Sequence, residues 1–206
     1  MNTKTTQNGR SMIEMLGVLA IIGVLSVGGI AGYSKAMQKY RINKTADQVA
    51  QIINGVRTLY SGQKNYTGIN GTVLRKAKIL PESAFESSSS NNVTNPFGGV
   101  LEIYATGRKL HDDNKAVALS LRGIPEDACI ELVTQDWGAG EGLYAINVDS
   151  PIGFLEGCAG EVRPTILTGC VGGSTVALPI PVDKAIITCS TGGENGEYNN
   201  ITFYFY

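Results

Sequence analysis

The chain has 206 residues, of which 17 are basic and 18 are acidic, so its formal net charge at pH 7 is −1. This near balance argues against nucleic acid as a partner, because nucleic-acid-binding domains are strongly basic. The length suits one long helix followed by one domain of ordinary size.

The first predicted element is an apolar segment that runs from Met15 to Tyr33 and contains no charged residue. As a helix it would be roughly 28 Å long, close to the thickness of the hydrocarbon core of a bilayer. We therefore predict a transmembrane helix. Glu14 lies at its edge, where a charge is costly and marks a function by default. The alternative is that Glu14 sits in the headgroup region without a role.

The helix is predicted to continue to about Ser61, because no proline occurs from Ser34 onward and apolar residues recur at helical spacing. Together the two stretches form one helix of about 50 residues, roughly 75 Å long. Within the apolar half, Gly28 and Gly32 form a small-xxx-small pattern, which allows helices to approach closely.

The rest of the chain alternates short apolar runs with turns, which predicts one α+β domain. Leu74–Leu80 is predicted as a short helix or strand, and a helix is predicted from Pro125 to about Asp136, with proline and acidic residues at its start. The predicted strands are Val100–Ala105, Ala116–Leu121, Leu143–Val148, Ala185–Thr188 and Ile201–Tyr206.

Charge is distributed unevenly along the chain. Residues 1–124 contain 15 basic and 7 acidic residues, whereas residues 125–206 contain 2 basic and 11 acidic residues. One interpretation is that the two halves neutralise each other within a subunit. The other is that opposite charges of neighbouring subunits meet in a head-to-tail assembly.

The four cysteines, all in the C-terminal half, are Cys129, Cys158, Cys170 and Cys189. None has the Cys-x-x-Cys spacing of a zinc or redox site, so we predict disulfides and an oxidising compartment. Their spacing leaves all three connectivities open. The basic cluster after the apolar segment, Lys35, Lys39, Arg41 and Lys44, would by the positive-inside rule lie in the cytoplasm. The cysteines argue for the opposite orientation.

The sequence contains no catalytic or nucleotide-binding fingerprint, and His111 is its only histidine. We therefore predict that the protein is not an enzyme and needs no cofactor or metal. Asp112-Asp113-Asn114 can be read as a weak calcium site, but a solvated turn is the better interpretation, because the run is too short for an EF-hand loop.

The segment Gly9-Arg10-Ser11-Met12-Ile13-Glu14 resembles the class III leader of type IV prepilins. An ordinary secretory signal would have its apolar run before the cleavage site, not after it. In the prepilin family a peptidase cuts after the glycine and methylates the new N-terminus, and the glutamate is required for assembly. The resemblance implies that Arg10 becomes the mature N-terminus and that Glu14 has the assembly role.

A second set of segments resembles type IVb pilins, the group that includes the subunits of toxin-coregulated and conjugative thin pili. These segments are Asn95–Gly99, Lys115–Leu121 and Gly123–Leu132. The resemblance implies the type IV pilin fold: a long N-terminal helix packed under an antiparallel β-sheet, with a disulfide around the C-terminal region. It implies the disulfide Cys129–Cys189 and leaves Cys158–Cys170 as the second pair.

The resemblance also divides the chain into a leader peptide (1–9), the transmembrane and assembly half of the helix (10–33), its amphipathic half (34–62) and a globular head (63–206). It implies a structural subunit of a helical homo-oligomeric filament that serves adhesion, aggregation or conjugation-type contact. The precursor would sit in the bacterial inner membrane, meet the prepilin peptidase and the pilus assembly machinery, and end in an extracellular pilus. The alternatives are a minor pilin or a secretion-system pseudopilin and, less consistent with the sequence, an envelope-anchored binding domain.

Overall fold

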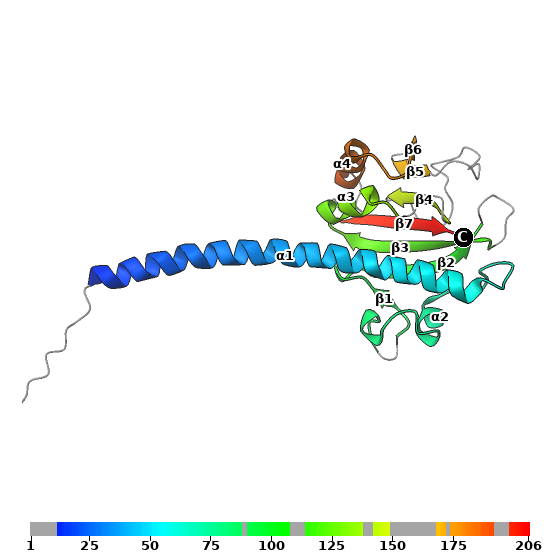
Figure 1. The fold of residues 1–206 in the computed structure, drawn as a ribbon, viewed down its shortest axis with the longest axis horizontal. Coiled ribbons are helices and arrows are strands. Elements are labelled where there is room, and N and C mark those ends of the chain that lie inside the picture. Colours follow the sequence, from blue (N-terminus) through cyan, green and yellow to red (C-terminus); the bar gives the residue numbers. More distant parts are fainter. Residues whose placement is uncertain are drawn as a thin grey trace, which may run out of the picture. The chain divides into compact units, whose positions relative to one another are not determined.

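The computed structural model describes residues 12–87, 90–107, 114–137, 142–148, 168–171, 174–191 and 198–206. The chain divides into two compact units, residues 1–40 and 41–206. Figure 1 shows the helices and strands. The helices are α1 (Met12–Tyr60), α2 (Gly71–Lys76), the 3-10 turn η1 (Glu82–Ala84), α3 (Glu126–Thr134) and α4 (Val182–Thr191). The strands are β1 (Val93–Thr94), β2 (Val100–Thr106), β3 (Ala116–Ile124), β4 (Leu143–Val148), β5 (Thr168–Val171), β6 (Ser174–Ala177) and β7 (Asn199–Phe205).

Helix α1 is continuous from Met12 to Tyr60, which confirms the prediction of one long helix. Residues 41–60 belong to the second unit, and there the buried residues recur every three or four positions. They are Ile42, Thr45, Gln48, Val49, Ile52, Ile53, Val56 and Tyr60. This spacing places them on one face of the helix, as expected for an amphipathic helix that covers a core.

The strands form one sheet in the order β1-β2-β3-β7-β4-β5-β6. The last strand of the chain, β7, therefore lies in the middle of the sheet, between β3 and β4 (Figure 1). All neighbouring pairs are antiparallel except β4 and β5, which are parallel. The predicted helix spine with an antiparallel sheet is confirmed, and the parallel pair is an addition that the strand pattern did not predict.

Alternate residues of the central strands point to opposite faces of the sheet, and both faces are buried. Leu119 of β3 and Phe203 of β7 are register partners and belong to the core that includes Val49 and Ile52 of α1. The opposite face carries a smaller cluster of Ala116, Ala118, Ala145 and Tyr204. Burial, with hydrogen bonding to Asn147 opposing it, raises the pKa of the Tyr204 hydroxyl well above its usual range.

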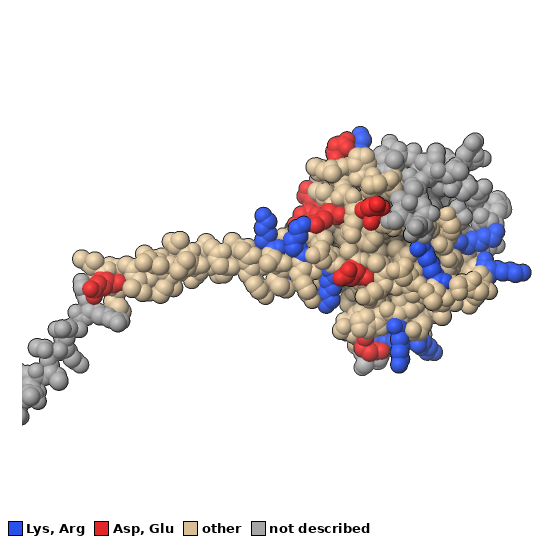
Figure 2. All heavy atoms as spheres, in the orientation of Figure 1, with Lys and Arg blue, Asp and Glu red and all other residues tan. Residues whose placement is uncertain are grey.

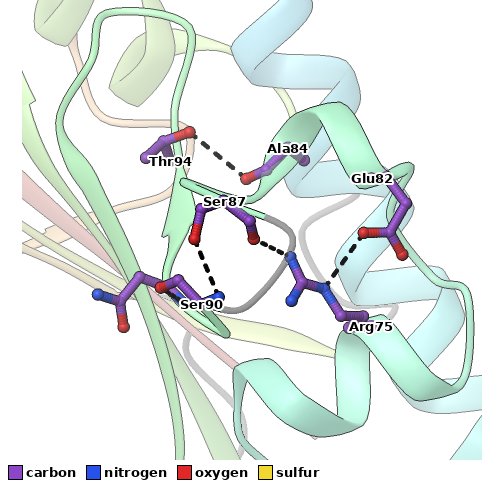
Figure 3. A network of polar contacts seen from close by, with 7 residues as sticks. Arg75, Glu82, Ala84, Ser87, Ser90 and Thr94 are labelled. Carbon is purple, nitrogen blue, oxygen red and sulfur yellow. Dashed lines mark hydrogen bonds and ion pairs between the residues drawn. The ribbon is translucent and has the colours of Figure 1, made fainter.

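The segment between α1 and the sheet packs closely against the helix. A side chain at Gly55 of α1 would bring its Cβ to 2.6 Å from a methyl carbon of Ile79, so glycine is required for this approach. Figure 3 shows that Arg75 of α2 contacts Glu82 and Ser87 in the segment that follows this helix. Its guanidinium donates to the carbonyl of Ser87 at 2.7 Å, lies 3.4 Å from Glu82 and stacks over the Phe85 ring.

The turn at Asn95–Gly99 connects β1 and β2 through the buried side chain of Asn95. Its Oδ1 accepts from the backbone amides of Phe97 (2.9 Å) and Gly99 (3.2 Å), and its Nδ2 donates to the carbonyl of Arg122 (2.7 Å). A Cβ at Gly99 would overlap that carbonyl. Asparagine and glycine in this segment therefore serve a turn that is docked against β3.

The predicted strand at Ala185–Thr188 is wrong, because this segment lies inside helix α4. Ala185, Thr188 and Cys189 are buried, whereas Ile186 and Ile187 are exposed, a spacing that fits a helix face and not a strand. Short apolar runs do not distinguish strand from helix by themselves. The overlooked signal was Pro181 followed by Asp183, because proline and an acidic residue both favour a helix start.

Cys129 of α3 and Cys189 of α4 form a disulfide with their Cα atoms 5.9 Å apart. Both cysteines are buried in the main core, so the bond joins two helices that pack beside the sheet. The disulfide implied by the resemblance is therefore present. Cys158 lies outside the described residues, and β5 is described without the side chain of Cys170, so the second pair stays a prediction.

Replacing both cysteines of this bond, as Cys129→Ala/Cys189→Ala, is expected to lower the free energy of unfolding by about 2–4 kcal/mol, because the bond closes a loop of 60 residues. Denaturant unfolding of the full chain in detergent measures the effect. The control is Lys184→Ala, which changes an exposed residue of α4 and should shift the stability by less than about 0.5 kcal/mol. Equal midpoints for the double variant and the parent would contradict this role of the bond.

Candidate assembly site

The first part of α1 presents a continuous apolar surface. Every residue from 12 to 36 is exposed, including Ile13 (79%), Val24 (75%) and Ile30 (69%). In the sequence, no charged residue lies between Glu14 and Lys35. Figure 2 shows a stretch of the helix without charged side chains, with acidic and basic groups only beyond its two ends. Because soluble monomeric proteins rarely expose apolar patches of this extent, the surface is expected to be covered by lipid or by other proteins.

Length and hydropathy agree with a membrane span. In the described part of the chain, α1 is the one helix that is long and apolar enough to cross a bilayer, with a window of 18 residues that has a mean hydropathy of 2.2. None of that window is buried within the chain. A buried core helix would show the opposite, so the apolar character of this segment serves contacts outside the subunit.

The glycines of this segment support the same conclusion. A Cβ atom placed on Gly17, Gly23, Gly28, Gly29 or Gly32 would meet no atom of the chain within 4 Å. Glycine inside a helix costs about 1 kcal/mol relative to alanine. Since no contact in the described part of the chain requires their small size, they are suited to close approach by a helix of another molecule.

Glu14 lies in the first turn of α1 and is exposed. A carboxylate at this position interacts favourably with the positive end of the helix dipole. Gly9 and Arg10 lie outside the described residues. The structure therefore places Glu14 next to the apolar surface, and the pairing of Glu14 with the amino group of Arg10 stays a prediction.

Of the three residues considered for calcium, Asp112 and Asp113 lie outside the described residues. The Asn114 amide donates to Thr67 Oγ1 at 3.0 Å, and the Asn114 carbonyl accepts from the backbone amide of Tyr66 at 2.8 Å. Asn114 therefore joins the loop after α1 to the start of β3.

One feature of the second unit was not found from the sequence. A pocket of about 380 Å³ lies where the end of α1, the loop after it, Lys115 and Tyr206 meet. Its lining comes from segments that are far apart in the chain, and this is why periodicity and motifs did not reveal it. A signal that could have been used is the sequence Tyr60 to Tyr66, in which two aromatic residues flank lysine and amide side chains.

Residues 39–201 match the family model described as PilS N terminal. The chain belongs to the PilS N-terminal family. The match covers most of the second unit and begins within α1.

Curated relatives are also pilins. The major structural subunit of bundle-forming pilus from Escherichia coli O111:H- is 26% identical over 147 residues, which cover 71% of this chain and 74% of the relative. Toxin coregulated pilin from Vibrio cholerae is 28% identical over 132 residues, which cover 64% of this chain and 58% of the relative.

Solved structures share the fold. The crystal structure of type IV b pilin from Salmonella typhi has a TM-score of 0.51 and 14% identity, and the match covers 78% of this chain and 96% of that one. TcpA, a type IV pilin from the Vibrio cholerae El Tor biotype, has a TM-score of 0.50 and 16% identity, with 81% and 99% covered. The predicted resemblance to type IVb pilins is confirmed.

A charge placed in the middle of the apolar surface tests its contact with membrane. Val24→Asp is expected to cost about 2.5–3.5 kcal/mol of insertion free energy, so the fraction of the precursor that resists carbonate extraction from membranes should fall. Val182→Asp is the matched control, because Val182 is also an exposed valine (58%) but lies in α4. Equal retention of the two variants would contradict the membrane assignment.

Proposed function

We propose that this chain is the structural subunit of a bacterial type IVb pilus and that it polymerises through the apolar half of α1. The observation that carries the proposal is the fully exposed apolar surface of residues 15–33 on a chain that belongs to a pilin family. In a filament, subunits cover this surface for one another and remove it from water, which makes homo-oligomeric assembly favourable.

The proposed life of the subunit begins as a precursor in the inner membrane. Residues 1–9 form the leader, the prepilin peptidase cuts after Gly9 and methylates the amino group of Arg10, and the pilus assembly machinery moves the mature subunit into the filament. Residues 10–33 are the membrane and assembly segment, 34–62 the amphipathic half of the helix and 63–206 the head. The extracellular filament serves adhesion, aggregation or conjugation-type contact.

Glu14 is proposed to fix the axial position of each subunit. In a filament core made of apolar helices, the carboxylate of Glu14 and the amino group of Arg10 are both removed from water. An unpaired buried charge costs several kcal/mol, and pairing the two groups between neighbouring subunits offsets that cost. Only one stagger of neighbouring helices brings the groups together, so the pair selects that stagger. The exposed position of Glu14 within the single subunit supports this proposal.

Processing can be tested by the mass of the subunit. Protein from sheared filaments is expected to begin at Arg10 with one added methyl group, because cleavage after Gly9 is what leaves Glu14 four residues from the new amino group. Intact mass spectrometry reads both properties. Gly9→Val should block cleavage, and the matched control Gly17→Val, eight residues further along, should leave it unchanged. Filaments whose subunits keep residues 1–9 would contradict the proposal.

Assembly can be tested at Glu14. Glu14→Gln keeps the size of the side chain but removes the charge, and so leaves the amino group of Arg10 without its partner. A buried unpaired charge costs about 3–5 kcal/mol, so the yield of sheared filaments is expected to fall more than about tenfold, while the precursor stays folded by circular dichroism.

The matched control for this variant is Glu82→Gln. The Glu82 side chain is 74% exposed and lies 3.4 Å from that of Arg75, which is 14% exposed. Glu82→Gln therefore removes a solvated carboxylate, while Arg75 keeps its hydrogen bond to the Ser87 carbonyl. Its filament yield should equal that of the parent chain. Filaments of normal yield and helical symmetry from Glu14→Gln would refute the pairing.

A further inference from the structure

The pocket at the end of α1 has the form of a binding site for a small polar molecule. Its volume of about 380 Å³ lies within the usual range for ligand sites. All of its lining residues belong to the second unit. Figure 1 shows the end of α1 and the end of β7 on the same side of this unit.

The aromatic part of the lining is held in place by the fold. Tyr60 is the last residue of α1 and is 92% buried, and its ring packs against that of Tyr66 with the centroids 5.3 Å apart. The backbone of Tyr66 is fixed by its hydrogen bond to the carbonyl of Asn114. Tyr206 is held by a 2.9 Å hydrogen bond from its amide to the carbonyl of Gly142. The fold therefore sets the backbone positions of Tyr66 and Tyr206 and the packing of the Tyr66 ring on that of Tyr60, which lowers the ordering cost of binding.

The polar part of the lining combines amides and ammonium groups. Gln63 and Asn65 supply hydrogen-bond donors and acceptors, and Lys64 and Lys115 supply positive charge. Among the described residues, no Asp or Glu side chain lines the pocket. The described side chains of the lining therefore carry a net positive charge. Burial raises the pKa of the Tyr66 hydroxyl, which reinforces the neutral form that tyrosine already has at neutral pH.

This set of groups matches the chemistry of one class of ligand. The faces of a sugar ring carry C–H groups whose partial positive charge is attracted to the negative faces of aromatic rings. The sugar hydroxyls match the amides of Gln63 and Asn65, and a carboxylate on the sugar matches the ammonium of Lys64. A purely apolar ligand would leave these polar groups without water or partners, and an extended nucleic acid needs a track of cations and rings and not one small pocket.

We propose that the pocket binds a single carboxylate-bearing sugar residue of a surface glycan or polysaccharide. The proposal deepens the proposed function, because it gives the filament a ligand class for surface contact. Its physical basis does not depend on polymerisation, since the pocket lies within one subunit.

The test uses the full-length chain in detergent and a panel of small glycosides. The acidic probes are the methyl glycosides of glucuronic, galacturonic and N-acetylneuraminic acid, and the neutral probes are methyl glucoside and methyl galactoside. At least one acidic probe is expected to bind with a dissociation constant of about 1 mM, as ligand size allows. The neutral probes are expected to bind at least about tenfold more weakly, the contribution of one charge-assisted hydrogen bond. Titration calorimetry or ligand-observed NMR measures both.

Substitutions then assign the binding to the pocket. Lys64→Gln should lower affinity for the acidic probe about tenfold and leave that for the neutral probe unchanged, whereas Lys64→Arg should retain it. Lys184→Gln on α4 removes the same charge outside the pocket and should have no effect. Tyr66→Leu should weaken both probes, and thermal unfolding of the same sample shows whether that variant is folded.

Two results would overturn the proposal. One is that no acidic probe binds more tightly than its neutral match, and the other is that Lys184→Gln weakens binding as much as Lys64→Gln. The Glu14→Gln chain, which is expected to form no filaments, separates this proposal from the function above. If Glu14→Gln forms normal filaments and binds the acidic probe as the parent does, the assembly proposal fails and the pocket proposal stands. If Glu14→Gln forms no filaments, and neither it nor the parent binds any probe, only the pocket proposal fails.

Discussion

One helix has to satisfy two different environments, and the rest of the structure depends on this constraint. From residue 42 onward, α1 buries a stripe of residues three or four positions apart, and this stripe forms one wall of the core of the second unit. From residue 12 to 36 the same helix buries nothing. The free energy that stabilises the head therefore comes from its own half of α1, and the free energy of covering the other half remains available for membrane insertion and assembly.

The central strand of the sheet is β7, the last strand in chain order. β7 pairs with both β3 and β4, so the central strand of the sheet is the final segment of the chain, while the helix that covers its face is the first. Contacts between such distant segments make folding slow, because loop closure precedes the stabilising contacts. The disulfide between α3 and α4 adds a covalent link between two helices whose cysteines are 60 residues apart in the chain.

Patterns that repeat along the chain were sufficient to predict the elements that depend on them. The period of α1, the apolar runs of β2, β3 and β4, and the acidic start of α3 all agreed with the structure within a few residues. The prediction failed at Ala185–Thr188, a run of four residues that is too short to distinguish a strand from a helix, because the helix-start signal of Pro181 and Asp183 before it was overlooked. Strand β5 was not predicted, so its parallel pairing with β4 was missed as well.

Of the two candidate sites, the assembly surface was predictable from the sequence and the pocket was not. Glu14 and the apolar surface follow from local sequence, since a charge at the edge of an apolar helix is expensive wherever it occurs. The pocket does not, because Tyr60 and Tyr206 come together only through the pairing of β7. These two features lie at opposite ends of α1, with Glu14 in its first turn and Tyr60 as its last residue. Glu14 belongs to the first unit and every lining residue of the pocket to the second, so the proposed assembly and the proposed ligand binding use different side chains.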